Sequence, residues 1–296
     1  MDNGRSGGRT RLGLVLEEPA PVYAHIQLPH PLDFEWRFTE STITSLWQLA
    51  HVLAGDREKI ILLGTPSLAK RAAERPVWSG PVLLFDKNKN AADLPNAKGR
   101  VEEIEFDILH DTPSKSNAAL VFADPPWYED ELKSFLWSST ALCGVGGHVA
   151  MSIPPLDTRP GIAEERVRIE QVARTFGLRP VRIFPSVLSY ETPFFEANAM
   201  RAAGVSQPND WRRGDLALYL HEGHFLGPRP VLSVGPRWTE RTIRNSRIRM
   251  KDQEPPGSGS PILREIVPGS ILPSVSRRDS RRAHVDVWTS GNRVLR

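Results

Sequence analysis

The stretch AALVFADPPWYEDEL, residues 118–132, joins an apolar run to an abrupt exit and to the start of a helix. Its first six residues are apolar without interruption, which is typical of a strand in a sheet that is covered on both faces. Pro125 and Pro126 cannot continue a paired central strand, because proline donates no backbone hydrogen bond and fixes φ. We therefore expect the chain to leave the sheet rigidly at Asp124.

Similar apolar runs alternate with helical patterns on both sides of this stretch. The other expected strands are KIILL (59–63), PVLLF (81–85), VEEIEF (101–106), GHVAMSI (147–153), RPVRIF (179–184) and DLALYL (215–220). The expected helices are SLAKRAAE (67–74), EDELKSFLWSSTALC (129–143) and GIAEERVRIEQVARTFG (161–177). Strands that alternate with helices predict right-handed βαβ units. The expected fold class is α/β, with a doubly wound, mostly parallel sheet of about seven strands.

The chain divides into three expected parts. Residues 1–32 form an extended lead-in, residues 33–224 form the α/β domain, and residues 225–296 form an irregular basic extension. The α/β domain opens with an amphipathic helix that Thr39 or Ser41 caps and Gly55 ends. Within the extension, residues 251–261 have the composition of a linker, and residues 284–296 have the pattern of a small hairpin.

Charge is distributed unevenly between these parts. The chain of 296 residues has a formal net charge of +3, but residues 225–296 contain 14 basic and 6 acidic side chains. The rest of the chain contains 24 basic and 29 acidic side chains. An arginine-rich extension on a mildly acidic domain suggests a nucleic acid or an acidic partner. The alternative is a solvated and partly disordered tail.

The sequence predicts a cytoplasmic protein. Its single cysteine, Cys143, excludes an internal disulfide framework and fits a reducing compartment. The opening residues lack the apolar core of a signal peptide, and no stretch approaches the ~18 apolar residues of a membrane span. We therefore expect neither export nor a membrane anchor.

In this architecture, ligands bind at the carboxyl ends of the strands. After KIILL, Gly64 lets the backbone approach a ligand closely, and Thr65 can cap a helix that begins at Pro66. The dinucleotide pattern G-x-G-x-x-G is absent, which disfavours a pyrophosphate cradle and favours a cofactor without phosphates. We expect Gly64 and Thr65 at the cofactor site.

Two aspartates follow the next two strands along the chain. Asp86 comes 22 residues after Gly64, close to the spacing at which this fold class hydrogen-bonds ribose hydroxyls. Asp107 is placed to accept a hydrogen bond from an adenine amino group. The alternative for either residue is an ordinary helix cap or turn.

The exit after residue 123 offers what an amino acceptor requires. The Asp124 carboxylate and a backbone carbonyl fixed by the prolines provide two acceptors for the N–H groups of an exocyclic amine. Trp127 or Tyr128 can stack on a flat substrate, a contact typically worth ~1–3 kcal/mol per base. The alternative is a turn before a helix, with Trp127 filling the core. Further along, SYETPFFEANAM (189–200) is expected as a polar loop whose phenylalanines form either an acceptor wall or core.

The sequence Asp124-Pro125-Pro126-Trp127 resembles the DPP-aromatic motif, DPPW or DPPY, of S-adenosylmethionine-dependent amino-methyltransferases with a class I Rossmann-like fold. The order of LLGTPS before FADPPWY is similar to that in the adenine-N6 methyltransferase group, which also contains lysine methyltransferases. The likeness covers about residues 33–224. It implies S-adenosylmethionine as cofactor near Gly64, Asp86 and Asp107, with Asp124, Pro125 and Trp127 or Tyr128 at the acceptor amine.

These features predict an enzyme that methylates an amino nitrogen, with adenine N6 in nucleic acid as the first choice of acceptor. Three alternatives remain open: a protein lysine or amine methyltransferase, a polyamine aminopropyltransferase, and a catalytically degenerate fold used as a binding or scaffold subunit. A partner protein is also considered, which would complete the cofactor site because the turn after KIILL contains only one glycine, Gly64. No metal is expected, because the cofactor supplies the electrophile and HEGH (221–224) lacks the H-E-x-x-H spacing.

Overall fold

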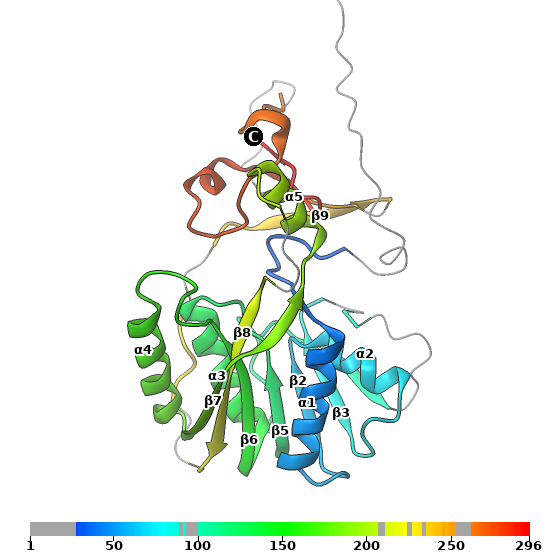
Figure 1. Cartoon of the computed structure of the whole chain (residues 1–296), viewed down its shortest axis with the longest axis vertical. Helices are drawn as coiled ribbons and strands as arrows, with labels where there is room; N and C mark the ends of the chain where they lie inside the picture. The colour runs from blue at the N-terminus through cyan, green and yellow to red at the C-terminus, as the bar shows by residue number, and fades with distance from the viewer. Residues whose placement is uncertain are drawn as a thin grey trace, which may run out of the picture.

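The computed structural model describes residues 28–88, 91–92, 100–206, 211–223, 227–232, 235–244, 246–252 and 262–296. Its main element is an eight-stranded sheet in the order β1-β7-β8-β6-β5-β2-β3-β4 (Figure 1). The strands are β1 (Arg37–Phe38), β2 (Ile60–Leu63), β3 (Val82–Asp86), β4 (Val101–Glu105), β5 (Ala118–Ala123), β6 (Cys143–Ile153), β7 (Leu178–Glu191) and β8 (Arg213–His221). The helices are α1 (Glu40–Leu53), α2 (Pro66–Glu74), α3 (Glu129–Leu142), α4 (Ile162–Thr175) and α5 (Phe194–Ala202). Of the helices in these residues, none combines the length and apolar character needed to cross a membrane.

The sheet is mixed, with a parallel half and an antiparallel edge. Strands β4, β3, β2, β5 and β6 are parallel neighbours. β8 and β7 then add antiparallel, and β1 pairs with the end of β7. The predicted α/β fold class is confirmed, and each predicted strand is present. β1 is absent from the predicted set because two residues are too few to show a periodic pattern.

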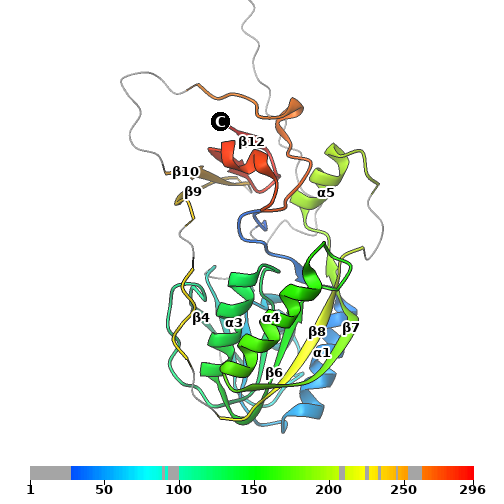
Figure 2. The same ribbon diagram turned by 90° about the vertical axis from the view of Figure 1, so that its left-hand side faces the viewer.

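Helices cover both faces of this sheet. α3 and α4 lie on one face, and α1 and α2 lie on the other (Figures 1 and 2). Each face has its own buried apolar core, with Phe135 and Leu136 in the first and Leu46 in the second. Burial on both faces explains why the central strands are continuous apolar runs. α1 begins at a predicted cap, where the Thr39 hydroxyl accepts a hydrogen bond from the Thr42 backbone N–H.

The strand order reverses between β2 and β5. The chain passes from β2 to β3 on one side and from β5 to β6 on the other. The backbone N–H of Asp124 donates to the Leu63 carbonyl at 3.1 Å, which joins the ends of the two strands. Open α/β sheets bind ligands at such a reversal, outside the carboxyl ends of the strands. The residues that follow β2 and β5 therefore lie at the expected binding crevice.

A second sheet lies beyond the carboxyl ends of the first (Figure 1). Its antiparallel strands, in the order β12-β11-β10-β9, are β9 (Trp238–Ile243), β10 (Ser246–Lys251), β11 (Val287–Thr289) and β12 (Val294–Leu295). We call the described residues from 235 onward the C-terminal lobe, which also contains the 3₁₀ helices η2 (Pro268–Ser270) and η3 (Ser280–His284). The predicted terminal hairpin is confirmed by the pairing of β11 with β12. The predicted lead-in up to residue 27 and most of the predicted linker lie outside the described residues.

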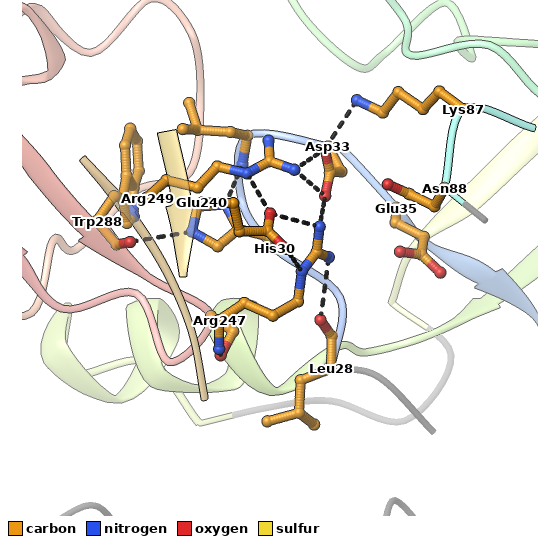
Figure 3. A network of polar contacts seen from close by, with 12 residues as sticks. Leu28, His30, Asp33, Glu35, Lys87, Asn88, Glu240, Arg247, Arg249 and Trp288 are labelled. Atoms are coloured by element: carbon orange, nitrogen blue, oxygen red, sulfur yellow. Dashed lines mark hydrogen bonds and ion pairs between the residues drawn. The ribbon is translucent and has the colours of Figure 1, made fainter. Parts of the chain in front are cut away.

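An ionic hub joins the lobe to the main sheet (Figure 3). The hub consists of Asp33, Lys87, Glu240, Arg247 and Arg249. Asp33 pairs with Lys87 at 2.7 Å and with each arginine at 2.8 Å, and both arginines also pair with Glu240. Burial raises the pKa of Asp33, but the three cations outweigh burial and hold that pKa well below its usual range. Because Lys87 directly follows β3, the hub fixes the lobe above the carboxyl end of the sheet.

Part of the basic extension is therefore used internally. Arg247 and Arg249 belong to the hub and are not free to contact phosphates. Trp288 is 1% exposed and packs with Leu272 and Val285 in the core of the lobe, so this indole has no free face for a base. These residues of the arginine-rich extension therefore contribute to the stability of a small sheet with few apolar residues, and not to a free basic surface.

Candidate active site

A cavity of about 890 Å³ lies where the main sheet meets the C-terminal lobe. Every residue of the predicted acceptor motif, 124–128, lines this cavity. The remaining lining includes Trp36, the loop after β6, the last turns of α5 and, from the lobe, residues 273–276 and Arg278. The site is therefore built jointly by the α/β domain and the lobe.

Two hydroxyl groups from neighbouring strands orient the Asp124 carboxylate. Ser152 of β6 donates a short hydrogen bond to Asp124 Oδ1. Tyr190 of β7 donates to the same oxygen at 2.8 Å. Within the described residues, Oδ2 accepts no hydrogen bond. The carboxylate is thus held in one orientation and keeps one oxygen for an incoming donor.

The environment of Asp124 changes its acidity. Burial raises the pKa of Asp124 to about 7, against the lowering effect of the Ser152 and Tyr190 hydrogen bonds and of Arg212. Burial raises the pKa of Tyr190 well above 10, and the nearby Asp124 adds to the rise. Tyr190 therefore remains a hydrogen-bond donor, while Asp124 titrates near neutral pH. A strongly shifted carboxyl in a cavity is typical of a functional residue.

Trp127 packs against the Arg212 guanidinium, which also lies over the Trp36 ring. The Arg212 guanidinium lies 3.8 Å from the ring centre of Trp36 and 4.7 Å from that of Trp127. Glu196 of α5 pairs with Arg212 at 3.5 Å and accepts a hydrogen bond from Trp36 Nε1 at 2.6 Å. Trp127 Nε1 donates to Ser152 Oγ at 3.3 Å. One face of the Trp127 indole is thus covered by a guanidinium.

Tyr128 fastens the lobe to the motif. The Arg277 guanidinium lies 4.6 Å from the Tyr128 ring centre and 4.3 Å from that of Phe34. The backbone N–H of Arg277 donates to the Tyr128 hydroxyl at 3.1 Å, and its guanidinium pairs with buried Glu131. Since Trp127 and Tyr128 each have an arginine on one face, stacking of an acceptor on either ring stays a prediction.

The turn after β2 contains an unsatisfied polar group. Gly64 has φ of +64°, and a Cβ at this position would lie 3.2 Å from the Phe135 ring. α2 begins at Pro66 as predicted, but the Thr65 side chain makes no capping hydrogen bond. Thr65 is 2% exposed, and its hydroxyl has no partner in the described part of the chain. Buried polar groups normally have a partner, so this hydroxyl is suited to contact a bound ligand.

Asp86 and Asp107 differ in how their carboxylates are used. Burial raises the pKa of Asp86 to about 7, and nearby Glu35 adds to the rise, while the Asn88 N–H donates to Oδ1 at 2.8 Å. Asp107 uses both oxygens locally: Oδ1 accepts from the Leu109 N–H, and Oδ2 lies 2.9 Å from His110 Nδ1. This geometry is that of a turn residue, and a cofactor role for Asp107 stays a prediction.

The structure brings Gly64 and Asp124 together, since a Cβ on Gly64 would lie 3.6 Å from the Asp124 carbonyl oxygen. Gly64, Thr65, Asp86 and Asp107 are not part of the cavity lining described above. Sequence reasoning missed Ser152, Arg212 and Glu35, which are single polar residues on other elements with no motif around them. It also missed Tyr190 and Glu196, because only the phenylalanines of the stretch 189–200 were singled out. The expected polar loop at 189–200 is also wrong, because residues 189–191 continue β7 and α5 follows, with Phe195 fully buried.

No family model matches this chain, and no curated protein matches it. The branched-chain polyamine synthase of Thermus thermophilus, solved with N4-aminopropylspermidine and 5′-methylthioadenosine, matches with a TM-score of 0.55 and 17% identity over 67% of this chain and 61% of that chain. The C9 mutein of the same synthase matches with a TM-score of 0.56 and 18% identity, over 66% of this chain and 60% of that chain. This chain thus spans about three-fifths of the synthase's length. A TehB-like SAM-dependent methyltransferase of Corynebacterium glutamicum matches with a TM-score of 0.42 and 13% identity, over 62% of this chain and 89% of that chain. The likeness to the two synthase structures shows the fold alone: the chain has a Rossmann-like, mixed α/β fold.

Proposed function

We propose that the protein is an S-adenosylmethionine-dependent methyltransferase that acts on an amino nitrogen, with adenine N6 in nucleic acid as acceptor. The observation that supports this most is the position of Asp124. Its carboxylate lines the cavity at the point where the strand order reverses, and its backbone adjoins Gly64. A methyl donor bound after β2 and an amine held at Asp124 would therefore be neighbours.

The residues after β2 and β3 fit the cofactor. Bound S-adenosylmethionine supplies an electrophilic methyl group on a sulfonium. The Gly64 turn allows close approach of a ligand, and the buried Thr65 hydroxyl lacks a partner in the described residues. Asp86 Oδ1 is bonded to Asn88, and its other oxygen is available to ribose hydroxyls. We assign Gly64, Thr65 and Asp86 to the cofactor.

Asp124 acts on the acceptor. An exocyclic amine donates one N–H to Asp124 Oδ2 and the other to the Pro125 carbonyl. The two hydrogen bonds point the nitrogen lone pair in a fixed direction and stabilise the positive charge that develops on nitrogen. Only the ionised carboxylate accepts in this way, so the pKa of about 7 makes the step depend on pH near neutrality.

The charge of the cavity distinguishes between acceptors. The charged side chains of the lining are Arg159, Arg212, Arg213, Arg278, Asp124, Asp157 and Glu196. A polyamine is a polycation and requires an excess of carboxylates, whereas here arginines outnumber carboxylates. The lining therefore favours a nucleic acid over aminopropyl transfer to a polyamine, and the aromatic walls favour a flat base over a lysine side chain.

Replacement of Asp124 tests this proposal. In Asp124→Ala, transfer of labelled methyl groups to an adenine-containing single-stranded oligonucleotide is expected to fall at least about a hundredfold. Calorimetry is expected to show unchanged S-adenosylmethionine affinity, because the cofactor residues lie after other strands. Asp157→Ala is the matched control, since Asp157 lines the same cavity, is exposed and makes no hydrogen bond to Asp124.

Unchanged turnover in Asp124→Ala would contradict the role of this carboxylate. The mass of the product provides a second check. A gain of one methyl supports methyl transfer, whereas a gain of an aminopropyl group supports the polyamine alternative.

A further inference from the structure

Four arginines line the cavity, and they fall into two pairs. Arg159 and Arg212 are mostly buried, with side chains 14% and 19% exposed, and each pairs with a carboxylate, Glu165 or Glu196. Arg213 and Arg278 are exposed, and no ion pair joins either of them to another described residue. Carboxylates of the fold neutralise the first pair of arginines, whereas the second pair is available to a negatively charged ligand.

The two unpaired arginines come from different parts of the molecule. Arg213 is the first residue of β8, and Arg278 belongs to the lobe segment that precedes η3. Both line one cavity because the lobe lies over the carboxyl ends of the main sheet (Figure 1), so neither sequence neighbourhood alone forms the site.

The backbone around Arg278 is held in place. Its N–H donates to the Ser276 hydroxyl at 3.2 Å. On one side, Arg277 is bonded to Tyr128 and Glu131, and on the other side the Asp279 carboxylate accepts from the Arg281 N–H at 3.0 Å. An arginine on a fixed backbone loses less entropy on binding than one on a mobile tail.

We propose that Arg213 and Arg278 form a phosphate-binding rim that holds the acceptor strand over Asp124. This inference rests on the proposed function and specifies its substrate: a phosphodiester chain whose base enters the cavity while its flanking phosphates contact the rim. Arginine binds phosphate through two parallel N–H donors, which gives orientation as well as affinity. Of the lining carboxylates, Glu196 pairs with Arg212, whereas Asp124 and Asp157 form no ion pair with a described residue, and the two arginines offset their charge.

The test is equilibrium binding of a short single-stranded oligoadenylate to the full-length protein without cofactor, followed by tryptophan fluorescence. Arg213→Gln and Arg278→Gln are each expected to weaken binding about tenfold. Each is also expected to lower the slope of log affinity against log salt by about one. The same oligomer with uncharged methylphosphonate linkages is expected to bind weakly and equally to all variants.

Arg241→Gln is the matched control. Arg241 is an exposed arginine of β9 that does not line the cavity, so its loss is expected to leave the affinity unchanged. Because Arg213 and Arg278 are also exposed, thermal unfolding of the variants is expected to match that of the unmodified protein.

Equal binding by the unmodified protein and both rim variants would overturn the inference, and so would an absence of binding by the unmodified protein. The outcome is separable from the proposed function. Arginine-dependent binding without methyl transfer would keep the rim and reject the reaction, whereas methyl transfer that is insensitive to both arginines would keep the reaction and reject the rim.

Discussion

The ionic hub and the cavity place the same type of side chain, an aspartate, in opposite surroundings. Asp33 has three cations around it and a pKa well below the usual range. Asp124 has two hydroxyl donors and only a more distant influence of Arg212, and burial raises its pKa to about 7. Removing a carboxylate from a buried ion-pair cluster destabilises a structure, whereas a carboxylate that is costly to ionise is typical of a functional site.

The largest expected effect comes from Asp33→Asn. The substitution leaves Lys87, Arg247 and Arg249 without their shared carboxylate, so the free energy of unfolding is expected to fall by about 3–5 kcal/mol. Urea denaturation of the full-length protein measures this. The control is Asp286→Asn, which removes a partly exposed partner of Lys251 at 3.9 Å and is expected to cost less than about 1 kcal/mol. Similar small effects of both substitutions would show that the hub does not hold the lobe.

For Asp124→Asn, the comparison predicts an increase in the free energy of unfolding, whereas Asp33→Asn is expected to lower it. The pKa of Asp124 rises from 3.8 to about 7 on folding, so between these values the native state binds the proton more tightly than the unfolded chain. The unmodified protein therefore loses stability as pH rises through this range. Asparagine avoids that loss, and the variant is expected to be about 2–3 kcal/mol more stable at pH 8, with a difference near zero at pH 4.

Unfolding at these two pH values measures the effect. Destabilisation of Asp124→Asn at pH 8, as expected for Asp33→Asn, would mean that Asp124 is a structural residue and that the contrast between the two aspartates is false.

A smaller effect is expected from Tyr190→Phe. The Tyr190 hydroxyl lowers the pKa of Asp124 by donating to it, so its removal raises that pKa further. Because the ionised carboxylate is the proposed active form, kcat/KM is expected to increase with pH through about 7, with its midpoint about one unit higher in the variant. Tyr219→Phe removes another buried tyrosine hydroxyl that does not contact Asp124, and its midpoint is expected to stay unchanged. A midpoint that stays or falls in Tyr190→Phe would contradict the assigned contact.

The α/β domain could be predicted from the sequence because its determinants are local. Strands buried on both faces are continuous apolar runs, and the prolines after Ala123 mark the end of β5 without any knowledge of the rest of the chain. The residues after β2 and β5 were placed at the same crevice because parallel strands end at one edge. The motif from Asp124 to Tyr128 was identified for the same reason.

The hub could not be predicted, because its partners are far apart in the sequence. Asp33 and Arg249 are separated by 216 positions, and charged residues are normally expected on the surface. The arginine-rich extension therefore suggested a free basic surface, although Arg247 and Arg249 belong to the hub. The hydroxyls of Ser152 and Tyr190 reach Asp124 only through the strand order, in which β6 neighbours β5 and β7 lies beyond β8.

Calorimetric titration with S-adenosylmethionine tests the central claim most directly, using the unmodified protein, Gly64→Ala and Gly146→Ala. Both glycines have positive φ, but a Cβ at Gly64 would lie 3.2 Å from the Phe135 ring beside the proposed cofactor site, whereas a Cβ at Gly146 meets nothing within 4 Å. We predict micromolar binding by the unmodified protein and by Gly146→Ala, with at least about tenfold weaker binding by Gly64→Ala. No binding by the unmodified protein, or equal binding by both variants, would contradict the assignment of the cofactor and of its site.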